Sequence, residues 1–361
     1  MAKIIRGSGL YRRLLLVYSM KTRAAVLYRL NEPLVIEEIE VPELRKGQVL
    51  VKVLYSGICG SQRNEIRGYK GTDKYLPHLM GHEASGIVQK IGSGVKKVKN
   101  GDYVVLSWIK GRGIDVPSST YSKDQILLNA GAITTLGEYT VVSENRVFKI
   151  SKNISPDVAA LLGCAVPTGA GAVINTLKAQ KGSSIAIFGV GGIGAAAIMA
   201  AKMTGCKFII AIDITDQKLL FAKKIGATHT INASKGDTLS QIQNILPKGV
   251  DYALEAAGTK ETMETAFAAL QSHGILAIAG NVKDGIKIEL TPFEFIKGKK
   301  VIGTWGGDTI PERDLLIYTK AFRSGILPLE KLITHCFSFY KINEAFSELA
   351  TGKAGRILIK F

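Results

Sequence analysis

Disulfide patterns, long apolar runs and low-complexity tracts are all missing from this sequence. Its 361 residues include four cysteines, which show none of the short-range pairing of a disulfide-stapled scaffold and so indicate a protein of the reducing cytoplasm. No apolar run approaches the about 20 residues that a membrane-spanning helix needs. We therefore expect neither a disulfide framework nor a membrane partner.

Acidic residues are scarce relative to basic ones. The 47 lysines and arginines outnumber the 30 aspartates and glutamates, which gives a formal net charge of +17. Such an excess suits a nucleic-acid partner, but the lysines are scattered and no nucleic-acid-binding module is recognisable among them. We therefore expect no nucleic acid and interpret the charge as a basic surface that attracts anionic substrates and cofactors.

What is present is the composition of a soluble globular α/β protein, with 46% hydrophobic residues and 39 glycines. A chain of this length predicts two domains, because single cores stop growing at about 250–300 residues. The pattern of the first domain starts at Met20.

Residues 1–19 are basic and contain no acid. Their apolar part, 14–18, is shorter than the about 7–15 residues of a signal-peptide core. We interpret 1–19 as a disordered basic extension, either non-native or read from an upstream start codon. A membrane-surface or targeting tail is the alternative.

Residues 183–213 predict a strand, a glycine turn, a helix and a second strand. The first apolar run, 185–188, is short and β-branched, as in a parallel strand buried on both faces. The glycines that follow are Gly189, Gly191, Gly192 and Gly194. The first permits a tight turn, the second lets the backbone approach a pyrophosphate, and the last lets the helix pack on the strand. The helix N-terminus then faces the phosphates.

Asp213 closes the second strand of this unit. A carboxylate there accepts hydrogen bonds from both adenosine ribose hydroxyls and repels a 2′-phosphate, which predicts NAD rather than NADP. The alternative is an ordinary doubly wound sheet that binds no nucleotide.

The chain before this unit predicts a β-rich domain of partly closed, barrel-like form, because short strands alternate with turns. The predicted strands are 24–28, 34–40, 48–56, 86–91, 102–107 and 138–142. Two stretches interrupt them: 57–83, which holds a cysteine and a Gly-His-Glu, and 108–136, which is polar, turn-rich and free of cysteine.

The chain after Asp213 alternates helices and strands, which implies right-handed parallel crossovers and a doubly wound parallel sheet. The predicted helices are 216–226 and 261–270, and the predicted strands are 228–231, 251–255, 274–279 and 300–305. From Gly306 the chain returns to the first domain and ends in a strand, 356–361. The predicted domains are therefore 20–165 with 306–361, and 166–305 for NAD.

Cys59, His82 and Cys164 are the candidate metal ligands. Three protein ligands with an open fourth position characterise catalytic zinc, and a Cys₂His set is one of its forms. Spacing alone leaves another interpretation open, because lone cysteines are most often small buried hydrophobic residues.

Four motifs occur in a specific order along the chain. They are Gly57-Ile58-Cys59-Gly60-Ser61, Gly81-His82-Glu83, Gly163-Cys164 with Thr168-Gly169, and the turn Gly189–Gly194 followed by Asp213. Together they resemble the zinc-dependent alcohol dehydrogenases of the medium-chain dehydrogenase/reductase family, from Met20 to Phe361. The resemblance implies a Rossmann domain, a GroES-like catalytic domain, NAD, one catalytic Zn²⁺ per chain, and a homodimer or homotetramer.

The resemblance also implies roles at the metal. Cys59, His82 and Cys164 hold zinc. Ser61 hydrogen-bonds the substrate hydroxyl, and Glu83 matches a carboxylate beside the ligands that tunes the metal. Zinc then acts as a Lewis acid that lowers the pKa of an alcohol, and hydride passes to the nicotinamide.

Around the cofactor, the resemblance implies four further contacts. Thr168 and Ile193 match positions behind the nicotinamide. Lys218 matches a lysine that supports the adenosine ribose, and Arg356 matches an arginine that approaches the pyrophosphate.

Three departures from the family pattern stand out. Gln62 replaces an aspartate that orients the zinc-bound histidine; its amide can accept that hydrogen bond but adds no charge. Asn64 replaces a histidine that ends the proton relay, so protons leave through water or another residue. Residues 108–136 lack the four cysteines of the structural-zinc lobe, so no second zinc is expected.

The remaining candidate residues are assigned structural roles. Cys206 and Cys336 are predicted to pack in apolar cores. The histidines outside the metal site are predicted to be structural or surface residues; they are His78, His229, His273 and His335.

The predicted substrate is a small alcohol or carbonyl compound, with a polyol, amino alcohol or sugar derivative favoured by the polar loop and the relay change. One alternative is a class III-like S-(hydroxymethyl)glutathione dehydrogenase, which the alanine-rich nucleotide helix and basic surface suggest. Another is a non-catalytic NAD-binding protein on the same fold.

Overall fold

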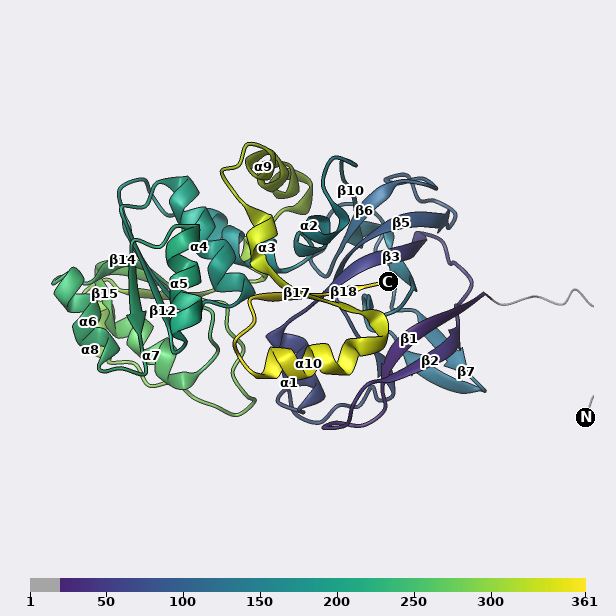
Figure 1. The fold of residues 1–361 in the computed structure, drawn as a ribbon, viewed down its shortest axis with the longest axis horizontal. Helices are drawn as coiled ribbons and strands as arrows, with labels where there is room; N and C mark the ends of the chain where they lie inside the picture. Colours follow the sequence, from purple (N-terminus) through teal and green to yellow (C-terminus); the bar gives the residue numbers. More distant parts are fainter. Residues whose placement is uncertain (1–19) are drawn as a thin grey trace, which may run out of the picture.

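The computed structural model describes residues 20–361, and the predicted basic extension 1–19 lies outside the described residues. The chain forms two lobes, one rich in strands and one in which helices cover a sheet (Figure 1). Between residues 20 and 361, no helix has the length and apolar character that crossing a membrane requires.

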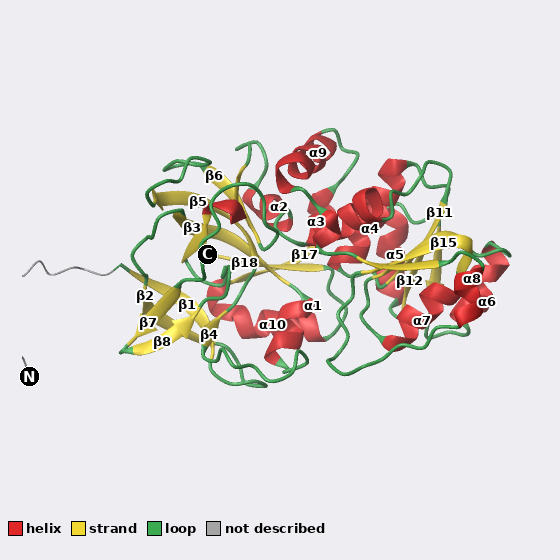
Figure 2. Cartoon of the chain, turned by 180° about the vertical axis from the view of Figure 1, so that it is seen from behind, coloured by secondary structure: helices red, strands yellow, loops and turns green. Residues whose placement is uncertain are grey.

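A closed barrel forms one end of the strand-rich lobe, as the view from behind shows (Figure 2). Its strands, in the order of pairing, are β1 (Lys21–Leu27), β2 (Val35–Glu40), β7 (Thr120–Lys123), β8 (Ile126–Asn129) and β4 (His78–Leu79). The sequence predicts no strand within 108–136, and that prediction is wrong, because the β7–β8 hairpin closes the barrel. Each hairpin strand has one fully buried residue, Tyr121 or Leu128, so the apolar alternation is too weak to recognise.

A second sheet packs beside the barrel, with the order β10-β6-β5-β3-β18-β17 and with β9 paired to β3. Its strands are β3 (Gln48–Ile58), β5 (Glu83–Ile91), β6 (Tyr103–Ser107), β9 (Tyr139–Ser143), β10 (Val147–Lys149), β17 (Ile333–Ser338) and β18 (Arg356–Lys360). Strand β18 runs antiparallel to β3, with Leu358 opposite Gly57. The C-terminal strand thus lies beside the strand that leads to Cys59.

Six parallel strands form the sheet of the other lobe, in the order β13-β12-β11-β14-β15-β16. They are β11 (Ser184–Phe188), β12 (Phe208–Asp213), β13 (His229–Asn232), β14 (Val250–Glu255), β15 (Leu270–Ile278) and β16 (Lys300–Gly303). In chain order this is 3-2-1-4-5-6, the doubly wound arrangement of dinucleotide-binding domains, which binds ligands where the order reverses. That point lies between β11 and β14, and the glycine turn follows β11.

Helices cover both lobes. They are α1 (Gly60–Ile66), α2 (Pro156–Leu161), α3 (Ala165–Gly171), α4 (Gly192–Thr204), α5 (Asp216–Ile225), α6 (Thr238–Ile245), α7 (Lys260–Ala268), α8 (Pro292–Ile296), α9 (Pro311–Arg323) and α10 (Ile342–Ala350). Helix α3 continues as a short π-helix, Ala172–Thr176. Shorter 3₁₀ turns occupy Glu144–Arg146, Gly306–Asp308, Leu329–Leu332 and Phe339–Lys341.

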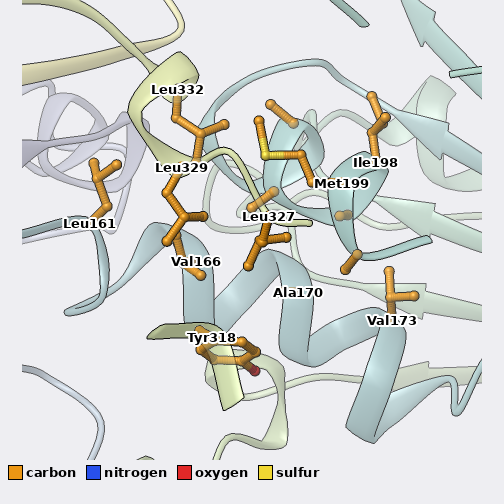
Figure 3. Close-up of a cluster of buried hydrophobic side chains, with 14 of the residues drawn as sticks. Leu161, Val166, Ala170, Val173, Ile198, Met199, Tyr318, Leu327, Leu329 and Leu332 are labelled. Carbon is orange, nitrogen blue, oxygen red and sulfur yellow. The ribbon is translucent and has the colours of Figure 1, made fainter. Parts of the chain in front are cut away.

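The largest buried apolar cluster of the described residues includes side chains from both lobes, and α3 packs against α4 within it; Figure 3 shows part of it, with Val166, Ala170 and Met199 labelled. Val166 and Ala170 of α3 and Met199 of α4 are buried in it, together with Leu327 and Leu329 from the C-terminal segment. Burying each large aliphatic side chain contributes about 1.5–3 kcal/mol. This core fixes the start of α3 relative to the start of α4.

Candidate active site

Three separate segments bring the predicted metal ligands together. Cys59 is the N-cap of α1, His82 precedes β5, and Cys164 is the N-cap of α3. The Sγ of Cys59 lies 3.5 Å from Nε2 of His82. One side-chain donor atom each of His82, Glu83 and Cys164 lies within 4.8 Å of the others.

These donors fit a zinc ion. Zinc binds thiolate and imidazole at about 2.0–2.3 Å, so two of its ligands are separated by no more than about 4.6 Å. A hydrogen bond from Cys164 lowers the pKa of Cys59 well below its usual value, and the nearby His82 and Arg356 act in the same direction. The same hydrogen bond, together with burial, raises the pKa of Cys164. The cluster therefore favours a thiolate at Cys59.

Glu83 lies behind the ligands with its side chain fully buried. Its Oε1 forms an ion pair with Arg356 of β18, and its Oε2 accepts a hydrogen bond from the backbone N–H of Ala165 at 3.3 Å. A Cβ built on Gly192 would stand 3.1 Å from Cδ of Arg356. The arginine thus lies between Glu83 and the glycine turn, and its contact with the pyrophosphate stays a prediction.

Helix α1 carries the predicted substrate contact and two of the departures. Ser61 is its second residue and is half-buried. Oε1 of Gln62 accepts a hydrogen bond from the N–H of Cys59 at 2.8 Å. Its Nε2 is buried and has no partner among residues 20–361. The oxygen that was available to orient His82 thus caps α1 instead. Asn64 accepts a 3.4 Å hydrogen bond from Arg63.

The glycine turn has the shape that a dinucleotide needs. Gly189 has a φ of +91°, and a Cβ there would stand 2.9 Å from the backbone nitrogen of Ala257. A Cβ on Gly191 would meet no protein atom within 4 Å, which leaves room for a pyrophosphate beside the start of α4. The N-terminal amides of this 13-residue helix favour an anion there.

Asp213 ends β12 next to this turn. Its Oδ2 accepts from the N–H of Val190 at 2.8 Å, its Oδ1 accepts from the N–H of Thr215 at 3.0 Å, and Nζ of Lys218 lies 3.9 Å away. A carboxylate has about four acceptor sites, so two stay available for ribose hydroxyls. Oγ1 of Thr168 is buried without a partner in the described part of the chain. The residues therefore fit NAD.

Trp108 lies at the site beside Cys164, and the sequence motifs do not predict it there. It follows β6 and packs edge-to-face on Trp305, with ring centroids 5.0 Å apart and planes at 88°. Its indole lies close enough to Cys164 to oppose the rise in the pKa of that thiol, and its Nε1 is buried. The sequence feature that could have indicated Trp108 is its position directly after the predicted strand 102–107.

The two other cysteines, Cys206 and Cys336, differ in burial. Cys206 is buried, as predicted. The prediction for Cys336 is wrong, because this residue is exposed. It lies on β17, an edge strand whose side chains alternate between half-buried and exposed, and Cys336 falls on the exposed face.

Family models match two parts of the chain. A zinc-binding dehydrogenase model matches residues 192–317, and an alcohol dehydrogenase GroES-like domain model matches residues 45–152. An S-(hydroxymethyl)glutathione dehydrogenase of Photobacterium damsela subsp. piscicida is 34% identical over 95% of this chain and 100% of its own length. Alcohol dehydrogenase 1 of Trifolium repens is 32% identical over 94% of this chain and 97% of its own.

A solved structure has the same fold over nearly the whole chain. Benzyl alcohol dehydrogenase from Acinetobacter calcoaceticus matches with a TM-score of 0.86 and 27% identity, over 95% of this chain and 99% of its own. The chain therefore belongs to the zinc-dependent alcohol dehydrogenase family, and it is an oxidoreductase of that type. The predicted fold class and the cofactors Zn²⁺ and NAD are confirmed by this membership.

Asp213→Asn is expected to weaken the preference for NAD over NADP. The amide keeps an acceptor for one backbone N–H but removes the charge that repels a 2′-phosphate. Hydrogen bonds to a charged group contribute about 1.5–3 kcal/mol each, so kcat/KM for NAD should fall about 10- to 100-fold. Initial rates with both cofactors measure the ratio, with Asp216→Asn, an exposed residue three positions on, as control. An unchanged ratio would contradict the assignment.

Proposed function

We propose that this protein transfers a hydride between an alcohol and NAD, with Cys59, His82 and Cys164 as the ligands of one catalytic zinc. When bound, zinc supplies Lewis-acid polarisation of the alcohol oxygen, and NAD accepts the hydride. The product is the aldehyde or ketone.

One observation supports this proposal most directly: a single short helix links Cys164, one of the proposed metal ligands, to the cofactor turn. Cys164 caps α3, and Thr168 lies one turn further along. A Cβ on Gly169 would contact the carbonyl oxygen of Ile193, so the backbones of α3 and α4 touch. Because reacting groups must be held within a few tenths of an ångström, a rigid link of this kind serves hydride transfer.

The other residues have distinct proposed tasks. Ser61, beside Cys59, donates to or accepts from the substrate hydroxyl and passes its proton toward solvent. The buried Arg356–Glu83 ion pair excludes water from the region behind the ligands and holds the surrounding backbone in place. Thr168 and Ile193 support the nicotinamide ring from the side opposite the substrate.

The purified protein is expected to contain about one zinc per chain and to reduce NAD with alcohols. Elemental analysis measures the metal, and NADH absorbance measures turnover over a panel of polyols, amino alcohols, sugar alcohols and simple primary alcohols. Zinc at one equivalent with no turnover on any alcohol or aldehyde would favour the non-catalytic alternative. A metal-free protein with full turnover would overturn the proposal.

A second candidate is oxidation of S-(hydroxymethyl)glutathione. The name of the relative from Photobacterium favours it, as does the formal charge of +17, because glutathione is an anion. Formaldehyde with glutathione and NAD separates the two candidates. Turnover that requires glutathione supports the second, and turnover of free alcohols alone supports the first.

We also propose a homodimer or homotetramer in the cytoplasm. The edge strand β16 and the exposed Ile296 of α8 leave apolar surface on the nucleotide lobe that a second copy would cover.

A further inference from the structure

Glu255 is the last residue of β14 and carries a buried carboxylate. It has none of the roles in metal, substrate or cofactor binding proposed above. Its side chain has no exposed surface, and its position lies at the carboxyl edge of the sheet, next to β11. Three donors converge on Oε1: the N–H of Ala257 at 2.9 Å, the N–H of Gly258 at 2.7 Å and the hydroxyl of Thr262 at 2.8 Å.

The second carboxylate oxygen of Glu255 is closely packed against Gly280 in the loop after β15. Oε2 is buried without a hydrogen-bond partner among the described residues, and it occupies the place that a Cβ on Gly280 would take. The backbone carbonyl of Glu255 accepts from the N–H groups of Ala279 and Gly280 at 2.9 and 3.0 Å. One residue therefore joins the loops after β14 and β15 to the first turn of α7.

The loop that Glu255 holds, residues 256–258, packs directly on the cofactor turn. The N–H of Ala256 donates to the carbonyl of Phe188, the last residue of β11, at 2.8 Å. The backbone of Ala257 comes so close to Gly189 that a Cβ there would stand 2.9–3.0 Å from it. Any displacement of the loop thus changes the position of the turn.

Burial of a carboxylate is costly unless its acceptors are used, and burial raises the pKa of Glu255. Thr259 already caps α7, because its hydroxyl accepts from the N–H of Thr262 at 3.2 Å, so the carboxylate of Glu255 is not needed as a cap. The side chain instead offers one oxygen to three donors, two in the loop and one on α7, which fixes the loop relative to that helix.

We infer that Glu255 is a positioning residue for the cofactor: its carboxylate fixes the loop 256–258 and, through Ala257, the glycine turn that receives the NAD pyrophosphate. The inference rests on the proposed function, because it assumes that NAD binds at this turn. Glu255 acts through the loop and touches neither substrate nor metal.

The test is direct binding of NADH, measured by calorimetry without alcohol, to the zinc-loaded protein and four variants. Glu255→Ala is expected to raise the dissociation constant at least about tenfold, and Thr262→Val about threefold, because hydrogen bonds to a charged group are lost. Glu255→Gln keeps an acceptor oxygen and should recover most of the affinity. Glu261→Ala, an exposed residue of α7, is the matched control and should bind as wild type does.

A merely structural role makes different predictions. It lowers the melting temperature but leaves the NADH dissociation constant and the KM for NAD unchanged in protein that remains folded. Unchanged affinity in folded Glu255→Ala would therefore overturn the inference. If that variant does not fold, unchanged affinity in Thr262→Val overturns it. Wild-type protein that does not bind NADH would instead overturn the proposed function.

Discussion

Cys164→Ser is expected to remove the zinc and to lower kcat/KM by at least about 10³-fold. A serine hydroxyl does not supply the thiolate that zinc prefers, and Lewis-acid catalysis contributes several kcal/mol to the transition state. Since about 1.4 kcal/mol corresponds to a factor of ten, a loss of three or more powers of ten follows. Cys59→Ser should behave in the same way. Zinc content by elemental analysis and NADH production measure both effects.

Cys206→Ser provides the matched control for these variants. Cys206 is also buried, but its Sγ lies 3.5 Å from the hydroxyl of Ser183 at the far end of the nucleotide unit. It should keep one zinc and wild-type turnover. Full zinc and full turnover in Cys164→Ser would show that the ligands have been assigned wrongly.

Arg356→Met is expected to destabilise the protein by about 3–5 kcal/mol, because it leaves the buried carboxylate of Glu83 without its counter-charge. The double variant Glu83→Gln, Arg356→Met should recover part of the loss, since both charges are then absent. Urea unfolding of the four proteins in a double-mutant cycle gives the coupling energy.

Lys360→Met is the control for replacing a basic side chain by methionine on the same strand. Lys360 is the last residue of β18 and is exposed. Its stability should differ by less than about 0.5 kcal/mol from wild type. If Arg356→Met unfolds at the same urea concentration as Lys360→Met, the ion pair does not contribute to the stability of the lobe.

The nucleotide lobe could be predicted from the residues themselves. The run 185–188 is apolar on both faces, which predicts a buried parallel strand. Gly189 follows directly and predicts the tight turn that ends it. The proposed zinc ligands could not be predicted in that way. Cys59, His82 and Cys164 come from three segments, and no local pattern says that their side chains converge. They are proposed as ligands because the combined motifs resemble those of a known family.

Where the prediction failed, the local signal was weak for a physical reason. Strands β7 and β8 of the barrel each bury only one side chain fully. Cys336 lies on an edge strand, where apolar neighbours face one side and the cysteine faces the other. The contact between Glu255 and the glycine turn depends on a loop whose path the sequence does not specify.

The edge-to-face pair of Trp108 and Trp305 contains both tryptophans of the chain. One ring follows a strand of the catalytic sheet and the other follows the last strand of the nucleotide sheet. All indole emission of the protein therefore originates at the junction between the lobes. A rotation of one lobe relative to the other would change the surroundings of both rings. The intrinsic tryptophan fluorescence spectrum would therefore report closure of the lobes without an added label.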